Sequence, residues 1–152
     1  PSGVKAIAAK DRITAIKIRS SRMLMAHGFL KKVFQVFDEY NTPVDMITTS
    51  EVAVSLTIDS TKNLDKIIEK LSVFSTVEID ENQTIICIVG DFVAESTGHA
   101  GKIFSALSSI PVRMISYGGS SHNISILVKS SQKVDALRAL HQVVCESNLI
   151  EV

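Results

Sequence analysis

The residues best suited to chemistry in this chain stand where an apolar helix is expected to begin. Gly28 precedes Phe29 and Leu30, and apolar residues recur from there to Tyr40 at three- and four-residue spacing, which predicts a helix. The first amides of a helix have no partners within it, and the helix dipole favours negative charge there. Glycine also lets a ligand approach the backbone. This entry could bind a carboxylate, although glycine is also a common way to begin a helix.

Acidic and hydroxyl side chains follow this helix at the two ends of an expected strand. Asp45 stands near its start, and Thr49, Ser50 and Glu51 stand at its end. Ionised carboxylates accept hydrogen bonds from an ammonium group, and hydroxyls can donate or accept. A carboxylate-binding helix entry combined with ammonium acceptors predicts an amino-acid site, whereas each residue taken singly could equally be an ordinary surface or turn residue.

Familiar catalytic motifs are missing from the sequence. Residues 98–102 (G-H-A-G-K) look like part of a phosphate-binding loop, but Ile103 stands where that loop needs a hydroxyl. The Gly-rich residues 117–123 join two expected strands, so a turn is the simpler interpretation. The four histidines lack zinc spacing, and Ser121, His122 and Asp91 could form a triad only on paper. We expect no catalysis, no metal and no cofactor in this part of the protein.

Composition allows one domain or two small ones. The chain has 152 residues, 45% of them hydrophobic, and its 16 basic and 16 acidic residues cancel. No apolar run exceeds five residues, which excludes a membrane-spanning helix. Cys87 and Cys145 stand in apolar surroundings, and two reduced thiols in the cytoplasm are the simplest interpretation, with a disulfide left open. The missing initiator methionine suggests a fragment of a longer protein.

The neutral total conceals an uneven distribution of charge. Residues 1–35 hold eight basic groups and one acidic group, a net +7, so the remainder carries −7. A basic stretch beside strands could mean RNA binding, but residues 4–19 lack the aromatic side chains on which an RNA-recognition sheet stacks bases. We expect a solvated or partner-facing surface, with no nucleic acid and no membrane as partner.

The chain repeats itself with an offset of about 70 residues. Residues 32–34 recur at 102–104, residues 43–48 at 111–116, and residues 52–56 at 124–128. Agreement in order, spacing and residue type indicates two copies of one module. The first copy is expected to run through a strand at 13–18, a helix at 29–40, strands at 44–49 and 52–58, a helix at 64–71 and a strand at 73–79. The second is expected to have a strand at 84–89, a helix at 98–109, strands at 112–116 and 123–128, and a helix at 132–144.

This order is βαββαβ, the ferredoxin-like plan of a four-stranded sheet with two helices on one face. The second copy lacks a final strand, which the N-terminal residues 5–9 could supply. We therefore predict an α+β protein of two tandem ferredoxin-like modules, with the first inserted within the second. The predicted domains are residues 11–81, and residues 1–10 together with 82–152.

Four sequence motifs in this arrangement resemble the paired ACT domains of aspartate kinase, in particular of its monofunctional, lysine-sensitive bacterial class. They are S-R-M-L (21–24), H-G-F-L (27–30), V-D-M-I-T-T-S-E-V (44–52) and Y-G-G-S-S-H-N (117–123). The resemblance covers essentially the whole chain. It implies a regulatory lobe, separate from a kinase domain that phosphorylates L-aspartate with ATP and Mg²⁺. The kinase motifs are not in this sequence, so the resemblance implies no enzyme activity for this stretch.

The resemblance also implies an L-lysine site in the first module, for feedback inhibition of lysine biosynthesis. Main-chain amides of Phe29 and Leu30 would bind the α-carboxylate, Asp45 an ammonium and Glu51 the distal ammonium. The full set implied is Met23, Gly28, Phe29, Leu30, Val44, Asp45, Thr49, Ser50 and Glu51. Arg113 stands at the position of Asp45 in the second module, where it would repel an ammonium, so that module is expected to serve assembly.

In the family, such pockets lie at a contact between two subunits, which implies a homodimer through the ACT domains. Three alternatives stay open. The lobe could sense threonine, it could be an ACT-type sensor attached to another protein, or it could be an RNA-binding ferredoxin-like protein.

Overall fold

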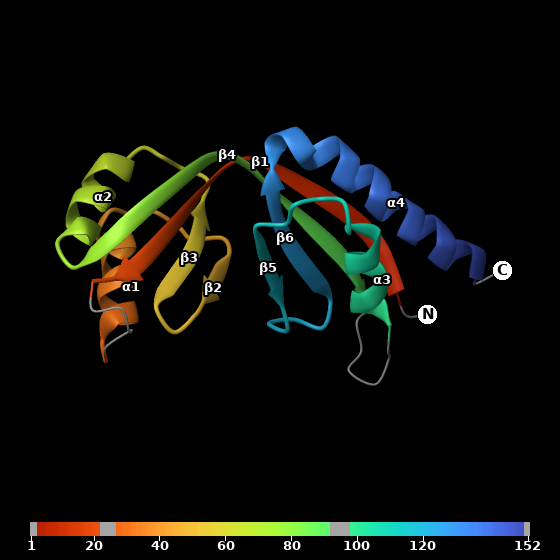
Figure 1. Ribbon diagram of the computed structural model, residues 1–152, viewed down its shortest axis with the longest axis horizontal. Helices are drawn as coiled ribbons and strands as arrows, with labels where there is room; N and C mark the ends of the chain where they lie inside the picture. Colours follow the sequence, from red (N-terminus) through yellow and green to blue (C-terminus); the bar gives the residue numbers. More distant parts are fainter. Residues whose placement is uncertain (1–2, 22–26, 92–97, 151–152) are drawn as a thin grey trace. The chain divides into compact units, whose positions relative to one another are not determined.

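Two long strands each extend through both copies of the repeat. The computed structural model describes residues 3–21, 27–91 and 98–150, with side chains described as far as residue 143. Strand β1 spans Gly3–Ser20 and strand β4 spans Ser75–Asp91 (Figure 1). By compactness the chain divides into unit 1, Pro1–Asp11 with Gln83–Val152, and unit 2, Arg12–Asn82. The predicted boundaries lie one residue before these.

The prediction of separate short strands at 5–9 and 13–18, and at 73–79 and 84–89, is wrong. Each pair is one continuous strand. Where a break was expected, each strand contains one residue with a left-handed backbone conformation. This residue is Arg12 (φ 59°) in β1 and Asn82 (φ 56°) in β4. One such residue lets a strand twist and continue rather than end.

Unit 2 has the strand order β2-β3-β1-β4. It continues from β1 through α1 (Phe29–Glu39), β2 (Ile47–Thr49), β3 (Ala53–Ile58) and α2 (Leu64–Ser72) to β4. Strand β3 pairs antiparallel with both neighbours, so that Leu56 faces Ile16 of β1 and Ile47 of β2. Strand β2 is shorter than the predicted 44–49, although Asp45 N still donates to Thr57 O (2.9 Å).

Unit 1 has the order β1-β4-β6-β5 and the same plan. After β4 come α3 (His99–Ala106), β5 (Met114–Tyr117), β6 (Asn123–Lys129), a 3-10 turn η1 (Ser130–Gln132) and α4 (Lys133–Ile150). Strand β6 pairs antiparallel with both neighbours, and Ile126 faces Ile86 of β4 and Ile115 of β5. Helix α4 runs beyond the predicted 132–144 and is twice the length of α2.

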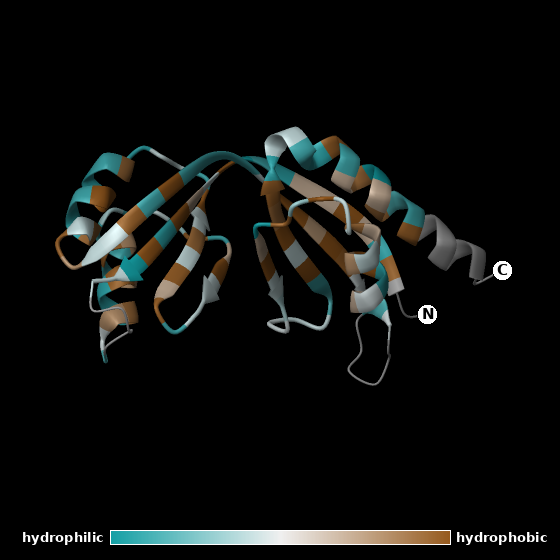
Figure 2. Ribbon diagram, viewed as in Figure 1, coloured by the Kyte–Doolittle hydropathy of each residue, from teal (hydrophilic) through white to brown (hydrophobic). Residues whose placement is uncertain are grey.

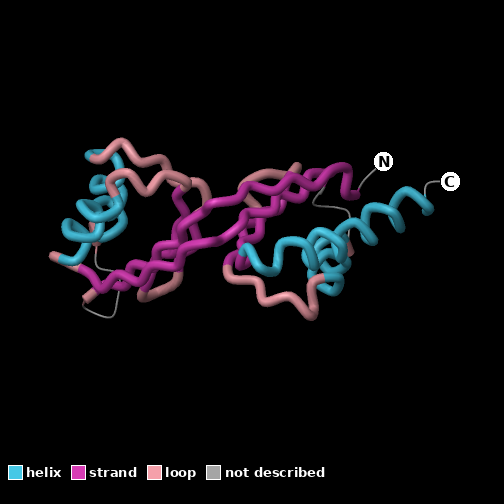
Figure 3. Tube along the Cα trace, turned by 90° about the horizontal axis from the view of Figure 1, so that it is seen from above, coloured by secondary structure: helices cyan, strands magenta, loops and turns pink. Residues whose placement is uncertain are grey.

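Each unit has its own apolar core between its sheet and its two helices, which lie on one face of that sheet (Figures 1 and 3). Brown apolar bands alternate with hydrophilic ones along the strands and helices in Figure 2, as expected for elements buried on one side. The core of unit 2 is centred on the fully buried side chains Ile16, Ile18, Val33, Leu56 and Ile67. The core of unit 1 is centred on Ile86, Ile88, Ile103, Ile124 and Ile126.

The two copies also match in backbone hydrogen bonds. Lys32 N donates to Gly28 O (3.1 Å) at the start of α1, and Lys102 N donates to Gly98 O (3.0 Å) at the start of α3. Asp45 N donates to Thr57 O (2.9 Å), and at the same place in the second copy Arg113 N donates to Leu127 O (2.8 Å). The repeat seen in the sequence is therefore a repeat of structure. The predicted match of residues 52–56 with 124–128 is wrong by two residues, because Val52 corresponds to His122.

Candidate functional site

The predicted carboxylate-binding entry is the start of α1. Gly28 is the residue before the helix, with φ 84°, and among the described residues no side chain caps the helix there. The ring of Phe29 is buried and stands edge-on to that of Phe74, with centroids 5.9 Å apart. Phe29 can therefore offer a ligand its amide but not its ring, while Leu30 is exposed. Met23, predicted as part of this site, lies outside the described residues.

The hairpin between β2 and β3 lies at the same end of unit 2 as the last residue of β1. Ser20 N donates to Val52 O (3.1 Å), which places the hairpin beside the end of β1. The Ser50 hydroxyl accepts from Ala53 N (3.2 Å), so it holds the hairpin turn. Thr49 and Glu51 are exposed beside it. All three predicted hairpin residues are thus exposed, and Ser50 also holds the turn.

Asp45 lies further along the sheet. Its backbone is opposite Thr57, whereas Ser50 N donates to Ala53 O, four residues away along β3. At a rise of about 3.3 Å per residue these positions are roughly 13 Å apart along the strand. Asp45 is exposed and Val44 is half-buried. Within one chain the predicted residues thus form two groups, the helix entry with the hairpin end, and residues 44–45.

A cavity that the sequence did not reveal adjoins the helix entry. Its volume is about 350 Å³, and it lies between the end of β1, the start of α1 and the turn before β4. Phe74 and Lys32 form part of its wall, and Lys32 Nζ lies 5.8 Å from the centre of the Phe74 ring. Of the basic N-terminal stretch, the described lining includes Lys32, together with His27.

In unit 1 the strand end that corresponds to Ser20 and Ser21 is occupied by Gly90 and Asp91. Asp91 Oδ2 lies 2.7 Å from Lys5 Nζ, and Asp91 Oδ1 lies 3.5 Å from His122 Nδ1. The hydrogen bond from the Lys5 ammonium, and its charge, hold the pKa of Asp91 below its ordinary value of 3.8. Ser120 Oγ accepts a hydrogen bond from the backbone amide of His122 (3.0 Å) rather than from its imidazole, and the geometry of the described residues gives no support to a catalytic triad.

Two further observations bear on the class of protein. Across residues 3–21, 27–91 and 98–143, no group of three or more His, Cys, Asp or Glu side chains is arranged to hold a metal ion. The helices, as far as the structure describes them, include none both long and apolar enough to cross a membrane.

Comparison with known proteins identifies the family. The ACT domain family matches residues 86–144. A solved domain from Porphyromonas gingivalis W83, assigned as a C-terminal regulatory domain of aspartate kinase, is 49% identical, with a TM-score of 0.83 over 91% of this chain and 95% of that one. This chain belongs to the ACT-type regulatory domains of aspartate kinase. The predicted α+β fold of two ferredoxin-like ACT modules is confirmed with it.

Longer relatives carry the same regulatory region. The lysine-sensitive aspartokinase 3 of Escherichia coli is 33% identical over 99% of this chain and 34% of its own length. The structure of E. coli aspartokinase III in complex with lysine and aspartate (T-state) is 33% identical, with a TM-score of 0.81 over 93% of this chain and 33% of that one. This regulatory chain thus spans about a third of the length of the E. coli relative.

Proposed function

We propose that this chain is the effector-sensing lobe of an aspartate kinase and that its effector is L-lysine. The observation that carries the proposal is the uncapped start of α1 at Gly28, at the end of unit 2 that also presents the exposed Glu51. The amides of that first turn would bind the α-carboxylate of an amino acid. Glu51 would accept a hydrogen bond from an ammonium group.

Two acids favour lysine over threonine. Lysine carries two ammonium groups and threonine one, and unit 2 presents two exposed carboxylates, Asp45 and Glu51, near the two ends of β2. The similarity to an E. coli enzyme whose structure contains lysine supports the same choice. Threonine stays the second candidate, because the small hydroxyl residue Thr49 could receive its side chain.

We further propose that two copies of the chain complete the site. Within one copy, Asp45 lies about 13 Å along β3 from the hairpin end and so belongs to a separate group of residues. A ligand held by the helix entry of one copy and by Asp45 of the other would use both groups. A ligand that bridges two copies stabilises the arrangement for which it has the higher affinity. That arrangement would hold the kinase domain inactive.

The chemistry itself would belong to another part of the protein. Phosphorylation of L-aspartate by ATP and Mg²⁺ would take place on a kinase domain of the same enzyme. Within this chain the nearest match to a phosphate loop is Gly98–Lys102, which begins α3 and is followed by the buried Ile103 rather than a hydroxyl. We therefore assign regulation, and not phosphoryl transfer, to these residues.

The test is a calorimetric titration of the purified chain with lysine and, separately, with threonine, together with its molar mass by light scattering with and without ligand. We expect saturable heat with lysine, little with threonine, and a shift toward dimer when lysine binds. Saturation by threonine alone would assign the second candidate. The absence of heat with lysine at millimolar concentration would contradict the proposal.

A further inference from the structure

The basic part of the sequence is not explained by a site for a cationic effector. From Arg12 to Phe37 there is no acidic residue, and the stretch contains six lysines and arginines and one histidine. Basic groups gathered at one place in the fold attract an anion. The structure brings part of this stretch, His27 and Lys32, to the wall of the cavity beside α1.

The wall of this cavity combines groups that bind the two ends of a small organic anion. The lining residues are Ser20, Ser21, His27, Phe29, Lys32, Val73 and Phe74. Imidazole and ammonium groups can donate to an anion, and the Phe74 ring offers an apolar surface. At about 350 Å³ the cavity is at the small end of the range for metabolite sites.

The geometry of the wall is fixed by contacts between its own residues. Ser21 Oγ donates to Phe74 O (3.2 Å), and the rings of Phe29 and Phe74 stand edge to face, with an interplanar angle of 80°. The Lys32 ammonium lies over the Phe74 ring. A polar group and an apolar surface are therefore held side by side before any ligand binds.

The second copy of the repeat shows what an acid does at this strand end. Gly90 N donates to His122 O (2.9 Å), as Ser20 N does to Val52 O (3.1 Å), so Asp91 occupies the place of Ser21. Its carboxylate lies against Lys5 and neutralises it. In unit 2 the described lining of the cavity includes no acid. The described lining in the first copy thus has basic groups and no acid, whereas the same strand end of the second copy carries Asp91.

We propose that the cavity between the end of β1, the start of α1 and Phe74 binds a small anion, a carboxylate or phosphate monoester with a flat apolar body. Lys32 and His27 contact the charged group, and Phe74 contacts the apolar body. The site shares the start of α1 with the proposed effector site. It differs from that site in ligand charge and in its use of the turn before β4, and it does not depend on lysine being the effector.

The test is titration of the ¹⁵N-labelled chain with benzoate, phenyl phosphate and inorganic phosphate, followed by NMR, with and without saturating lysine. We expect saturable shifts of the Ser21, Lys32 and Phe74 amides with benzoate or phenyl phosphate. Inorganic phosphate, which lacks the apolar body, should bind more weakly. Comparing the affinities for benzoate and phenyl phosphate tells whether a carboxylate or a phosphate is recognised.

Two matched variants make the test specific. Lys32→Gln should weaken binding by about tenfold, because it removes a charge-assisted hydrogen bond. Lys31→Gln removes the same charge from a neighbour outside the described lining and should change affinity by no more than about twofold. Ser21→Asp, which copies the second module, should abolish anion binding, and its amide spectrum reports whether it folds. Equal losses in Lys31→Gln and Lys32→Gln, or no saturable shift with any probe, would overturn the proposal while leaving the lysine titration intact.

Discussion

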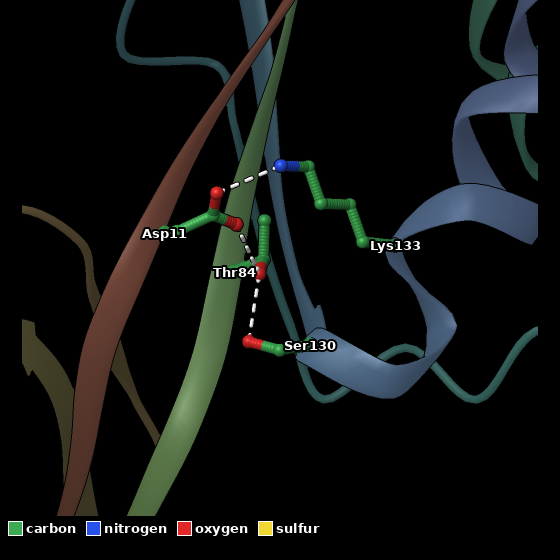
Figure 4. Close-up of polar contacts among 4 residues, drawn as sticks. All are labelled: Asp11, Thr84, Ser130 and Lys133. Atoms are coloured by element: carbon green, nitrogen blue, oxygen red, sulfur yellow. Dashed lines mark hydrogen bonds and ion pairs between the residues drawn. The ribbon is translucent and has the colours of Figure 1, made fainter.

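Lys133 Nζ lies 2.7 Å from Asp11 Oδ2, so the first residue of α4 is joined to a residue in the middle of β1 (Figure 4). The other carboxylate oxygen of Asp11 accepts a hydrogen bond from the hydroxyl of Thr84 on β4 (3.0 Å). The same hydroxyl lies 2.9 Å from Ser130 Oγ in the turn before α4. Four residues from β1, β4, η1 and α4 thus form one polar cluster in unit 1, which fixes where α4 begins.

Thr84 should be the most sensitive member of this cluster. Its side chain is fully buried, whereas Asp11 is half exposed. Thr84→Val keeps the shape but removes the hydroxyl, and should lower the free energy of unfolding by about 1–3 kcal/mol. Asp11→Asn should cost about 1 kcal/mol or less, because the ion pair is largely solvated. Urea unfolding measures both, with Thr84→Ser as control, and a larger loss for Asp11→Asn would contradict this ranking.

The two glycines of α3 should respond to alanine in opposite directions. Gly98 precedes the helix with φ 92°, and Gly101 lies within it, and an added Cβ would meet no atom within 4 Å at either position. Gly98→Ala should therefore cost about 1–2 kcal/mol through backbone strain alone. Gly101→Ala should stabilise by about 0.5–1 kcal/mol, because alanine loses less freedom on helix formation. Thermal unfolding of both variants is the measurement, and a change of the same sign in both would refute it.

The lowered pKa of Asp91 makes its contact with Lys5 dependent on pH. A carboxyl group whose pKa is depressed by folding stabilises the folded chain at pH above its unfolded value of 3.8, and that contribution is lost as the pH falls through the folded value. Carboxyl ¹³C NMR should show Asp91 titrating below 3.8. Lys5→Gln removes the first cause of the shift and should raise the pKa of Asp91. An unchanged pKa in Lys5→Gln would show that Lys5 does not hold it down.

Asp45 should contribute to the affinity for lysine if the proposed effector site is correct. Asp45→Ala should weaken lysine binding by about 2–5 kcal/mol, the scale for truncating one member of a desolvated charge pair. Asp65→Ala removes an equally exposed acid from α2 and serves as the control. Calorimetry on both variants gives the comparison. Equal affinities for Asp45→Ala and the unaltered chain would remove Asp45 from the site.

Much of the fold could be predicted because the two copies agree. The apolar spacing around Val33 and Ile67 identifies the helices of the first copy, and the β-branched runs around Ile16 and Ile126 identify a strand in each copy. The continuity of β1 and β4 could not be predicted, because Asn82 is a residue typical of turns. Here it adopts a left-handed conformation within a strand, and only pairing with neighbouring strands shows that the strand continues.

The site was less accessible to sequence reasoning than the fold. The helix entry at Gly28 could be found because local spacing defines where a helix starts. The edge-on contact of Phe29 with Phe74 joins residues 45 positions apart, and no pattern in the sequence links them. The position of Asp45 relative to the hairpin end likewise depends on the strand register, which the sequence does not state.

The shared strands have a consequence for the order in which the molecule folds. Unit 1 is built from two segments, and its core joins Val4 to Ile126 across the whole of Arg12–Asn82. Closing 71 disordered residues would cost about 4 kcal/mol in chain entropy. If unit 2 folds first, β1 and β4 become neighbours and its two ends meet, so that this cost has already been met. Unit 2 then serves as the folding nucleus for unit 1. It is also synthesised before Gln83–Val152, the larger segment of unit 1.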